Sequence, residues 1–378
     1  MTPIDPQPAP SVGESATADR PGPSRLTRRV WVTAAFGALV SAWAWAQAAA
    51  PEPAPTPAAP VFPPFVKGGN VSAWNVADVD RVFADAERLG LDTITIPVRV
   101  RMAYATSSDA AVDPVSLAFA KKVIGHSQKH RYILEPYPWI ADGSVAETEL
   151  APADKAAWFA AYEKAVLEIA GQFPNAWGIY VASNLVKLED QSAAWLSLIA
   201  KVRGAFAGKV IYRTQWWVTA EWEPSTLAAW KAKLDNPVFG AVDVIAVAAY
   251  FELSEAPNPN ADELKAALRS TTVFGRKQNV LAEITALQKR WQKPIFLGEL
   301  SCPAVDLGAQ TPWDPAASEQ PNREIQKHYI SAYLDSLAGP ASAFLGFSVF
   351  TIAHPTPTTY DLAASAAEYV RHYRPRQP

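Results

Sequence analysis

The residue best suited to chemistry is a glutamate that closes an apolar run. The run from Lys293 to Leu300 reads KPIFLGEL, and its only acidic residue is Glu299. In a parallel sheet or barrel, this carboxylate would lie at the carboxyl end of a strand, where active sites form. There it could attack the anomeric carbon of a sugar or stabilise an oxocarbenium ion. Glu299 is therefore predicted to be a catalytic carboxylate, and the alternative is a structural glutamate held in an ion pair.

Polar and aromatic side chains also collect at the ends of the other β-type runs. Sugar rings have flat C–H faces that stack on aromatic rings, while carboxylates, amides and guanidinium groups bind the hydroxyls. The alternative is that these aromatic residues close the top of a barrel as core. Because they recur at most strand ends, interleaved with polar groups, a glycan-binding site is favoured. The candidates are Arg99, Glu135, Asn184 and Gln215, with the aromatic residues Trp74, Tyr137, Trp139, Trp216, Trp217, Tyr250 and Trp313.

Eight β-type runs, rich in Val, Ile, Phe and Tyr, alternate with amphipathic helical stretches. This order over about 310 residues is typical of a single-domain (β/α)8 TIM barrel, here predicted for residues 65–378. A doubly wound open sheet would favour a Gly-rich phosphate turn after the first strand, and VKGGN is not one. The predicted strands are Val66–Trp74, Thr93–Met102, Tyr132–Trp139, Ala176–Asn184, Lys209–Trp217, Val242–Phe251, Pro294–Cys302 and Phe344–Ile352. The predicted helices are Val79–Leu89, Pro114–His130, Pro152–Phe173, Ser192–Phe206, Thr226–Leu234, Ala261–Trp291, Asn322–Leu337 and Tyr360–Arg374.

The N-terminal segment has the composition of an export signal. Arg28 and Arg29 precede an uncharged apolar run from Val30 to Ala46, which ends in the small-x-small pattern of residues 46–48. Residues 1–48 are therefore predicted to be a signal peptide. The paired arginines resemble the twin-arginine consensus, and the general secretory route stays open.

A Pro- and Ala-rich linker, residues 49–64, follows the signal. We expect a periplasmic or secreted protein. An uncleaved signal would instead tether the chain to the inner membrane through residues 30–48, since the apolar run is just long enough to span a bilayer.

Composition excludes several classes of protein. With 34 basic and 37 acidic side chains the net charge is −3, so no excess of cations is present to bind nucleic acid. Cys302 is the only cysteine and the five histidines show no paired spacing, so neither a metal site nor another cofactor is predicted. The 14 tryptophans suggest stacking surfaces as well as core.

Several stretches resemble glycoside hydrolase family 113, whose members are β-mannanase-type barrels within a clan of retaining glycosidases. They are KPIFLGE at 293–299, Pro312–Asp314, Gln326, Tyr329 and Tyr333, Trp195–Arg203, Gly208–Tyr212 and Val242–Ile245. The resemblance implies that Glu299, at the end of the seventh strand, is the nucleophile. It also implies an acid/base glutamate at the end of the fourth strand. There the sequence has Asn184, or Leu185 if the alignment shifts by one residue, and neither side chain donates a proton.

Loss of the acid would cost roughly 10² to 10⁴ in rate on poor leaving groups. Another carboxylate could replace it. Glu135 is preferred because a strand end holds geometry better than a loop. Glu189, or Glu221 and Glu223 in the loop after the fifth strand, are the alternatives.

The sequence thus predicts an exported glycosidase-type protein that acts on a polysaccharide, with an impaired retaining site. One alternative is a catalytically inactive glycan-binding barrel that serves exopolysaccharide synthesis or export, and another is a periplasmic transglycosylase. If nothing else supplies the acid, Asn184→Glu should restore activity. No change would mean that another carboxylate already acts, or that the site has lost more than one part.

Overall fold

The computed structural model describes residues 64–337 and 343–375. The predicted signal peptide, and the linker apart from residue 64, lie outside these residues. Within them, no helix is both long and apolar enough to cross a membrane.

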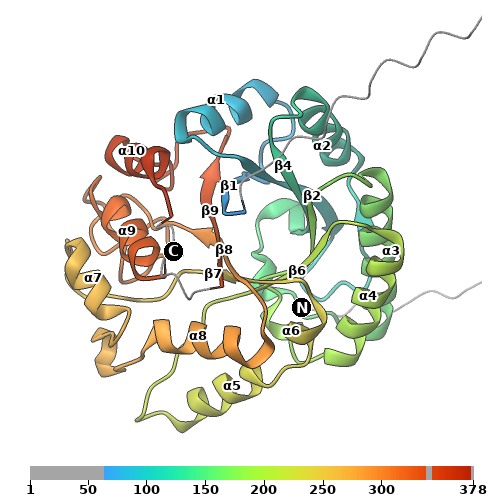
Figure 1. Cartoon of the computed structure of the whole chain (residues 1–378). Helices are drawn as coiled ribbons and strands as arrows, with labels where there is room; N and C mark the ends of the chain where they lie inside the picture. Colours follow the sequence, from blue (N-terminus) through green and yellow to red (C-terminus); the bar gives the residue numbers. More distant parts are fainter. Residues whose placement is uncertain (1–63, 338–342, 376–378) are drawn as a thin grey trace, which may run out of the picture. The chain divides into compact units, whose positions relative to one another are not determined.

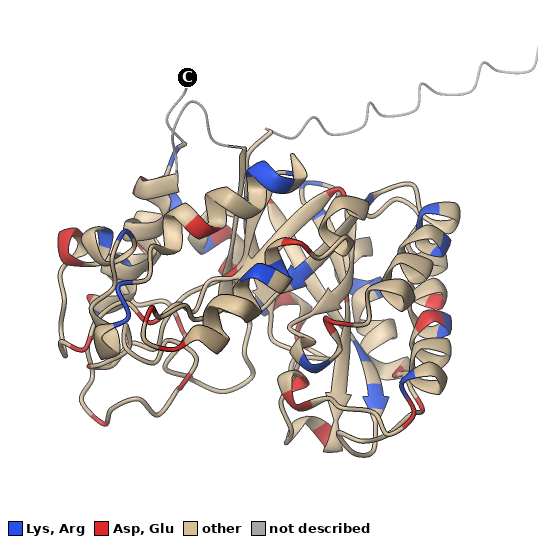
Figure 2. Ribbon diagram, turned by 90° about the horizontal axis from the view of Figure 1, so that it is seen from below, with Lys and Arg blue, Asp and Glu red and all other residues tan. Residues whose placement is uncertain are grey.

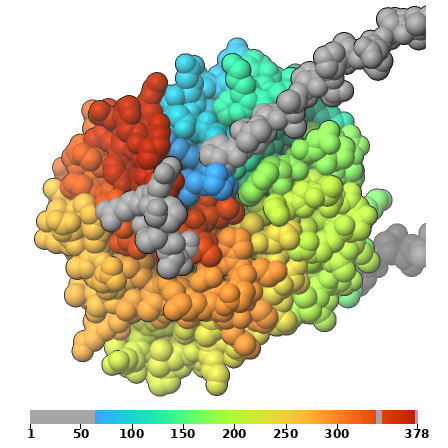
Figure 3. Space-filling view, in the orientation of Figure 1, coloured from blue at the N-terminus to red at the C-terminus, as the bar shows by residue number. Residues whose placement is uncertain are grey.

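Eight parallel strands of the described chain close into a barrel, as the sequence predicts (Figure 1). Closure is made by the first strand, which pairs with both the second and the last. In the space-filling view, the colours run once around the ring, so that elements consecutive in the chain are neighbours (Figure 3). The strands are β1 (Val66–Val71), β2 (Thr93–Met102), β4 (Arg131–Ile140), β5 (Gly178–Ser183), β6 (Lys209–Thr214), β7 (Val244–Ala248), β8 (Ile295–Leu300) and β9 (Phe344–Ile352). A short strand, β3 (Ala111–Val112), pairs antiparallel with β2.

Helices surround the barrel, with sequence signals that fix their ends. Asp78 caps α1 by accepting from Arg81 N, and Gly90 ends it in the left-handed conformation. Asp113 and Asp154 cap α2 and α3 in the same way. The helices are α1 (Val79–Leu89), α2 (Pro114–His126), α3 (Lys155–Gln172), α4 (Ser192–Ala205), α5 (Pro224–Leu234), α6 (Val238–Ala241), α7 (Ala261–Ala267), α8 (Val280–Trp291), α9 (Ile325–Leu337) and α10 (Ala364–His372).

The single helix predicted over Ala261–Trp291 is wrong. The structure has α7, a 3₁₀ turn at Val273–Gly275 and then α8. Phe274 has a φ of 51°, which an α-helix does not allow, and the Thr271 hydroxyl bonds the carbonyl of Glu252 instead of serving the helix. Asn279 then caps a new helix.

Two layers of side chains form the core. Inside the barrel lies a small cluster of buried residues from the first halves of the strands. Its members are Val66, Ile133, Tyr180, Ile211, Val244, Ala246 and Phe296. A larger cluster lies between strands and helices and includes the fully buried Trp158 and Trp195, so part of the tryptophan content is core. Charged residues lie mostly on the helices and loops, while the strands are largely uncharged (Figure 2).

Several predicted strands extend past the observed ladders. Trp74, Trp217 and Phe251 lie beyond the last residues of β1, β6 and β7. Their aromatic side chains have high strand propensity, but the chain already turns there into the loops above the barrel. These loops hold the site described next.

Candidate active site

A cavity of about 900 Å³ opens at the carboxyl ends of the strands. Residues from β1, β4, β5, β6, β7, β8 and β9, or directly after them, contribute to its wall. They include Trp74, Glu135, Tyr137, Trp139, Glu147, Asn184, Gln215, Trp216, Tyr250, Glu299, Trp313, Phe350 and Tyr360. The sequence-predicted residues at the strand ends are therefore largely brought together in one place.

Glu299 lies at the floor of this cavity near the end of β8 and is buried. Its Oε1 accepts from Arg213 Nη2 at 2.9 Å, and its Oε2 accepts from Asn184 Nδ2 at 3.2 Å. The preceding residue, Gly298, makes this arrangement possible. A Cβ at that position would lie 2.9 Å from Arg213 Cδ and 3.0 Å from the Tyr180 hydroxyl, closer than real side chains pack.

Arg213 is a buried cation on β6 that the sequence reading did not single out. Its Nη2 bonds both Glu299 and Oε1 of Glu135 on β4, so these two carboxylates share one nitrogen. Two acceptors of one nitrogen lie within about 6 Å of each other. Burial alone lowers the pKa of Arg213, but the charges of Glu135 and Glu299 outweigh it and hold the pKa above its usual value. Arg213 therefore stays charged beneath the cavity.

Glu299 has an environment that disfavours its charge. Burial raises its pKa to about 7, and the charges of Glu147 and Glu135 act in the same direction. Arg213 and the hydrogen bond from Asn184 lower it without cancelling the rise. A perturbed carboxylate of this kind in a cavity is characteristic of a functional site.

Asn184 faces Glu299 across the cavity floor, just after β5. Its backbone φ is 53°, a left-handed conformation that asparagine adopts more readily than glutamate does. Its Nδ2 donates both to Glu299 and to Oε1 of Glu147, the latter at 3.0 Å. One amide group thus joins two carboxylates.

Glu147 is a second site residue that was not predicted from the sequence. It begins a 3₁₀ turn, Glu147–Glu149, in the loop between β4 and α3, and it lines the cavity. Tyr137, on β4, donates its hydroxyl to Oε2 of Glu147 at 3.0 Å. Burial, followed by the charges of Glu147 and Glu135, raises the pKa of Tyr137 well above its usual value, so this phenol remains a donor. No sequence signal marks Glu147, because a loop's path over a barrel is not encoded in local periodicity.

The other carboxylates considered as replacement acids are paired with a cation or lie outside the cavity wall. Glu135 lines the cavity but is paired with Arg213. Glu189 pairs with Lys233 and accepts from Thr214. Glu189, Glu221 and Glu223 are absent from the cavity wall formed by the described residues.

Aromatic side chains form two groups around the cavity. Trp74, just after β1, and Trp139, on β4, meet edge to face with centroids 4.7 Å apart. Trp216 and Trp313, from the loops after β6 and β8, stack at 5.0 Å. Trp74 and Trp313 are 50% and 38% exposed, so each group presents an open ring to a ligand. In the ring of strands, β5, which ends just before Asn184, lies between β4 and β6, whereas Glu299 is on β8, the strand that leads into the loop of Trp313.

Two predicted binding residues lie outside the wall. Trp217 stacks on Trp230 and donates its indole N–H to Glu283 at 2.8 Å, so its contacts are those of a core residue. Arg99 places its guanidinium 3.9 Å from the centroid of Trp139 and bonds the carbonyl of Ala73. It therefore supports the first aromatic group from behind.

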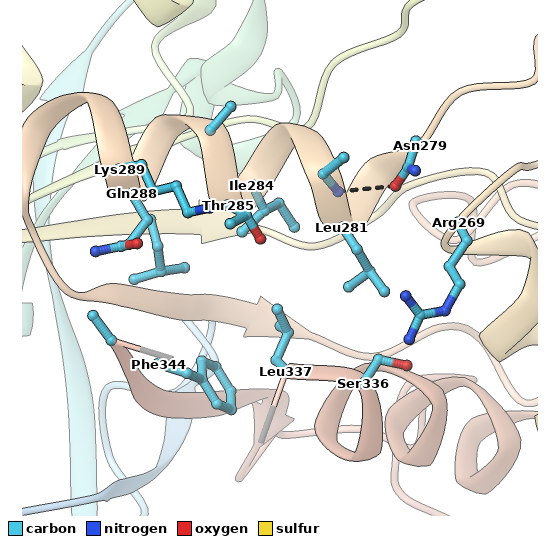
Figure 4. A pocket seen from close by; sticks show the side chains of 14 residues that line it. Arg269, Asn279, Leu281, Ile284, Thr285, Gln288, Lys289, Ser336, Leu337 and Phe344 are labelled. Atoms are coloured by element: carbon cyan, nitrogen blue, oxygen red, sulfur yellow. Dashed lines mark hydrogen bonds between the residues drawn. The ribbon is translucent and has the colours of Figure 1, made fainter. Parts of the chain in front are cut away.

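No group of three or more metal-ligating side chains occurs among residues 64–337 and 343–375. A second cavity, of about 700 Å³, lies outside the barrel between α8 and α9 (Figure 4). Its lining includes Ile295 and Phe344, the first residues of β8 and β9, so it is far from the strand ends that carry Glu299. The candidate active site is therefore the cavity around Glu299.

A barrel of this topology with a carboxylate at the end of its seventh strand is an architecture that glycoside hydrolases use. The sequence model of Glycoside Hydrolase Family 113 matches residues 141–370, and the chain belongs to this family. The match includes Asn184, Arg213 and Glu299.

Solved structures give the same architecture. A β-1,4-mannanase of family 113 in complex form is similar with a TM-score of 0.61 and 17% identity, over 81% of this chain and 97% of that one. A family 113 β-mannanase from Alicyclobacillus acidocaldarius has the same TM-score and identity, over 81% and 96% of the two chains. A β-D-glucuronidase from Dictyoglomus thermophilum reaches a TM-score of 0.50 at 12% identity, over 81% and 50%. At these identities the similarity concerns the fold. No curated protein matches the chain.

Proposed function

We propose that the chain is a retaining glycoside hydrolase that cleaves O-glycosyl bonds in a neutral polysaccharide, with Glu299 as nucleophile. The observation that carries the proposal is the position of Glu299, in the cavity floor and held from two sides by Arg213 and Asn184. Fixed donors on both oxygens orient the carboxylate for attack and leave it little freedom.

The cavity wall supports a neutral substrate. None of the described residues that line the cavity is lysine or arginine. Four of them are glutamates: Glu135, Glu147, Glu149 and Glu299. An acidic polysaccharide would meet carboxylates there and no lysine or arginine of the described wall to pair with. The two groups of aromatic rings favour a chain of several sugars over a single one. We propose a β-1,4-mannan-type polymer, because the solved structures of the family that are similar to this chain are β-1,4-mannanases.

Turnover of activated glycosides tests the proposal. A panel of 2,4-dinitrophenyl β-glycosides (mannoside, mannobioside, glucoside, galactoside) has a leaving group that needs no proton. The purified barrel should hydrolyse at least one of them, and Glu299→Gln should abolish that turnover. Binding of mannohexaose without any turnover would instead favour the inactive glycan-binding barrel. Transfer to added sugar acceptors in place of hydrolysis would favour the transglycosylase.

We also propose export to the periplasm or beyond, on the sequence of residues 1–48 alone. Mass spectrometry of the mature chain from the extracytoplasmic fraction tests it. Cleavage after residue 48 is expected, and replacement of Arg28 and Arg29 by lysine should block export if the twin-arginine route is used.

A further inference from the structure

Because residue 184 is asparagine, the proposed hydrolase lacks the usual proton donor at the end of β5. Another carboxylate, that of Glu147, lies within hydrogen-bond distance of Asn184. Glu147 Oε1 and Glu299 Oε2 accept from the same nitrogen, Asn184 Nδ2, at 3.0 and 3.2 Å. The two N–H bonds of a primary amide diverge by about 120°, so the accepting oxygens lie about 5 Å apart. A retaining pair of carboxyl groups has a separation of about 5 to 5.5 Å.

The loop that carries Glu147 is anchored on both sides of this residue. On one side, Ile140 and Val145 form an antiparallel bridge. On the other, Leu150 is buried and Ala151 N donates to the carbonyl of Ala105 at 2.8 Å. These contacts give a loop residue the fixed geometry that a catalytic group needs.

Gly143 allows the loop to fold back over the barrel. Its φ of 88° favours glycine, and a Cβ there would lie 2.4 Å from the ring of Trp139. The loop therefore packs on the first aromatic group and carries Glu147 into the cavity from above.

Glu147 is better placed than Glu135 to exchange a proton with a substrate. Glu135 is a buried residue whose Oε1 is already engaged in an ion pair with Arg213. Glu147 has no cationic partner among the described residues. It is half-buried, and both of its recorded partners, Asn184 and Tyr137, are neutral donors.

We propose that Glu147 is the acid/base residue of this enzyme and replaces the glutamate missing from the end of β5. The inference rests on the proposed hydrolase function. It adds a catalytic residue that comes from a different element, the loop after β4.

The chemistry balances with Glu147 protonated and Glu299 ionised at the start. A Glu299 oxygen forms a bond to the anomeric carbon, the bond to the glycosidic oxygen breaks, and that oxygen takes the proton of Glu147 and leaves as an alcohol. Water then attacks the anomeric carbon and gives its proton to Glu147. The ester bond to Glu299 breaks, which restores both carboxyl groups and releases the sugar with retained configuration.

The starting protonation state is consistent with the electrostatics of the site. The charge of Glu147 is one of the causes that raise the pKa of Glu299. A proton on Glu147 removes that cause and allows Glu299 to ionise beside Arg213.

Glu147→Gln tests the proposal, because glutamine has nearly the size of glutamate and its amide oxygen can still accept from Asn184, but it cannot exchange a proton. On mannohexaose, the variant should lose roughly 10²- to 10⁴-fold in kcat/KM. On the 2,4-dinitrophenyl glycoside that the wild type cleaves, kcat/KM reports the attack by Glu299 and should stay within about tenfold of the wild-type value. Added azide should raise turnover of this glycoside and give a glycosyl azide of retained configuration, because azide replaces water without needing a base.

Three further variants make the outcome decisive. Glu221→Gln, an exposed glutamate outside the cavity, should match wild type in every assay. Glu299→Gln should be inactive on all substrates and should not respond to azide. If Glu299→Gln is inactive but Glu147→Gln matches wild type, or if azide rescues Glu135→Gln instead, the assignment of Glu147 is wrong while the proposed hydrolase stands. If the wild type cleaves no glycoside of the panel, the proposed function itself fails.

Discussion

Arg213 Nη2 lies 2.9 Å from Glu299 Oε1, deep in the barrel, on the side of the carboxylate away from the open cavity. The same nitrogen bonds Glu135, so one cation compensates two buried anions. This arrangement fixes the orientation of Glu299. It also makes the fold depend on an ion group inside its core.

Removal of that cation should destabilise the protein strongly. Arg213→Met would leave Glu135 and Glu299 buried without a counter-charge, and breaking a buried pair in this way costs about 3 to 5 kcal/mol. Urea unfolding at pH 7 measures the loss. Arg290→Met, which removes an exposed ion pair with Asp235, is the matched control and should cost less than about 1 kcal/mol. Equal losses in the two variants would contradict the compensating role of Arg213.

Glu299→Gln should stabilise the protein at and above neutral pH. The folded-state pKa of Glu299, about 7, is above its ordinary value of 4.5, so the folded chain binds more protons than the unfolded chain between these values. Stability from this group is therefore present below pH 4.5 and is lost as the pH rises to 7. Glutamine does not titrate, so the variant does not lose this stability. The difference in free energy of unfolding between variant and wild type should therefore shift in favour of the variant by up to about 3 kcal/mol between pH 4 and pH 8. Unfolding in urea at several pH values measures it, and a constant difference would contradict the raised pKa.

The acid limb of the pH–rate profile should move when Glu147 is neutralised. In the wild type, kcat/KM on the activated glycoside should fall below pH 7, because protonated Glu299 cannot attack. The charge of Glu147 contributes to that raised pKa, so in Glu147→Gln the limb should shift to lower pH. A profile measured from pH 4 to pH 9 tests the direction of the shift. An unchanged limb would mean that the two carboxyl groups do not interact.

Asn184→Glu should lower activity, because Glu147 is proposed to supply the acid; the restoration expected from the sequence applies only if nothing else supplies it. The residue has a left-handed φ of 53°, which costs a side chain with no local hydrogen bond about 1 to 2 kcal/mol. Glutamate would also replace the donor between Glu147 and Glu299 by a third carboxylate. Steady-state kinetics on mannohexaose should show a loss of tenfold or more. A gain in kcat would mean that the site lacks a working acid and that Glu147 does not serve as one.

The stacked pair Trp216 and Trp313 should contribute to glycan binding more than other exposed tryptophans do. Loss of the open face of Trp313 in Trp313→Ala should raise the dissociation constant for mannohexaose about tenfold, which corresponds to roughly 1.4 kcal/mol. Trp222→Ala removes a tryptophan that is 62% exposed but outside the cavity wall, and it should bind as wild type does. Calorimetric titration of the Glu299→Gln background avoids turnover. Equal losses in both variants would contradict the assigned binding surface.

The barrel and the position of Glu299 were predictable from the sequence, because both depend on local patterns that repeat along the chain. The predicted ranges of β2, β9 and α1 match the structure to the residue, since alternating apolar runs and caps mark these elements. The break between α7 and α8 was missed, because a left-handed residue such as Phe274 leaves no mark in helical periodicity.

The sequence by itself determined which strand end carries a carboxylate and which lacks one. Only the tertiary structure decided the partners: Arg213 reaches Glu299 and Glu135 from a third strand, and Glu147 enters from a loop. It also decided that Trp217 packs inward while Trp216 faces the cavity. The physical reason is that a stretch forms a strand because of the hydrophobic pattern of a few neighbouring residues, which can be read from the sequence. A contact between residues far apart in the chain, such as Arg213 and Glu299, depends instead on how the closed ring of strands brings them together.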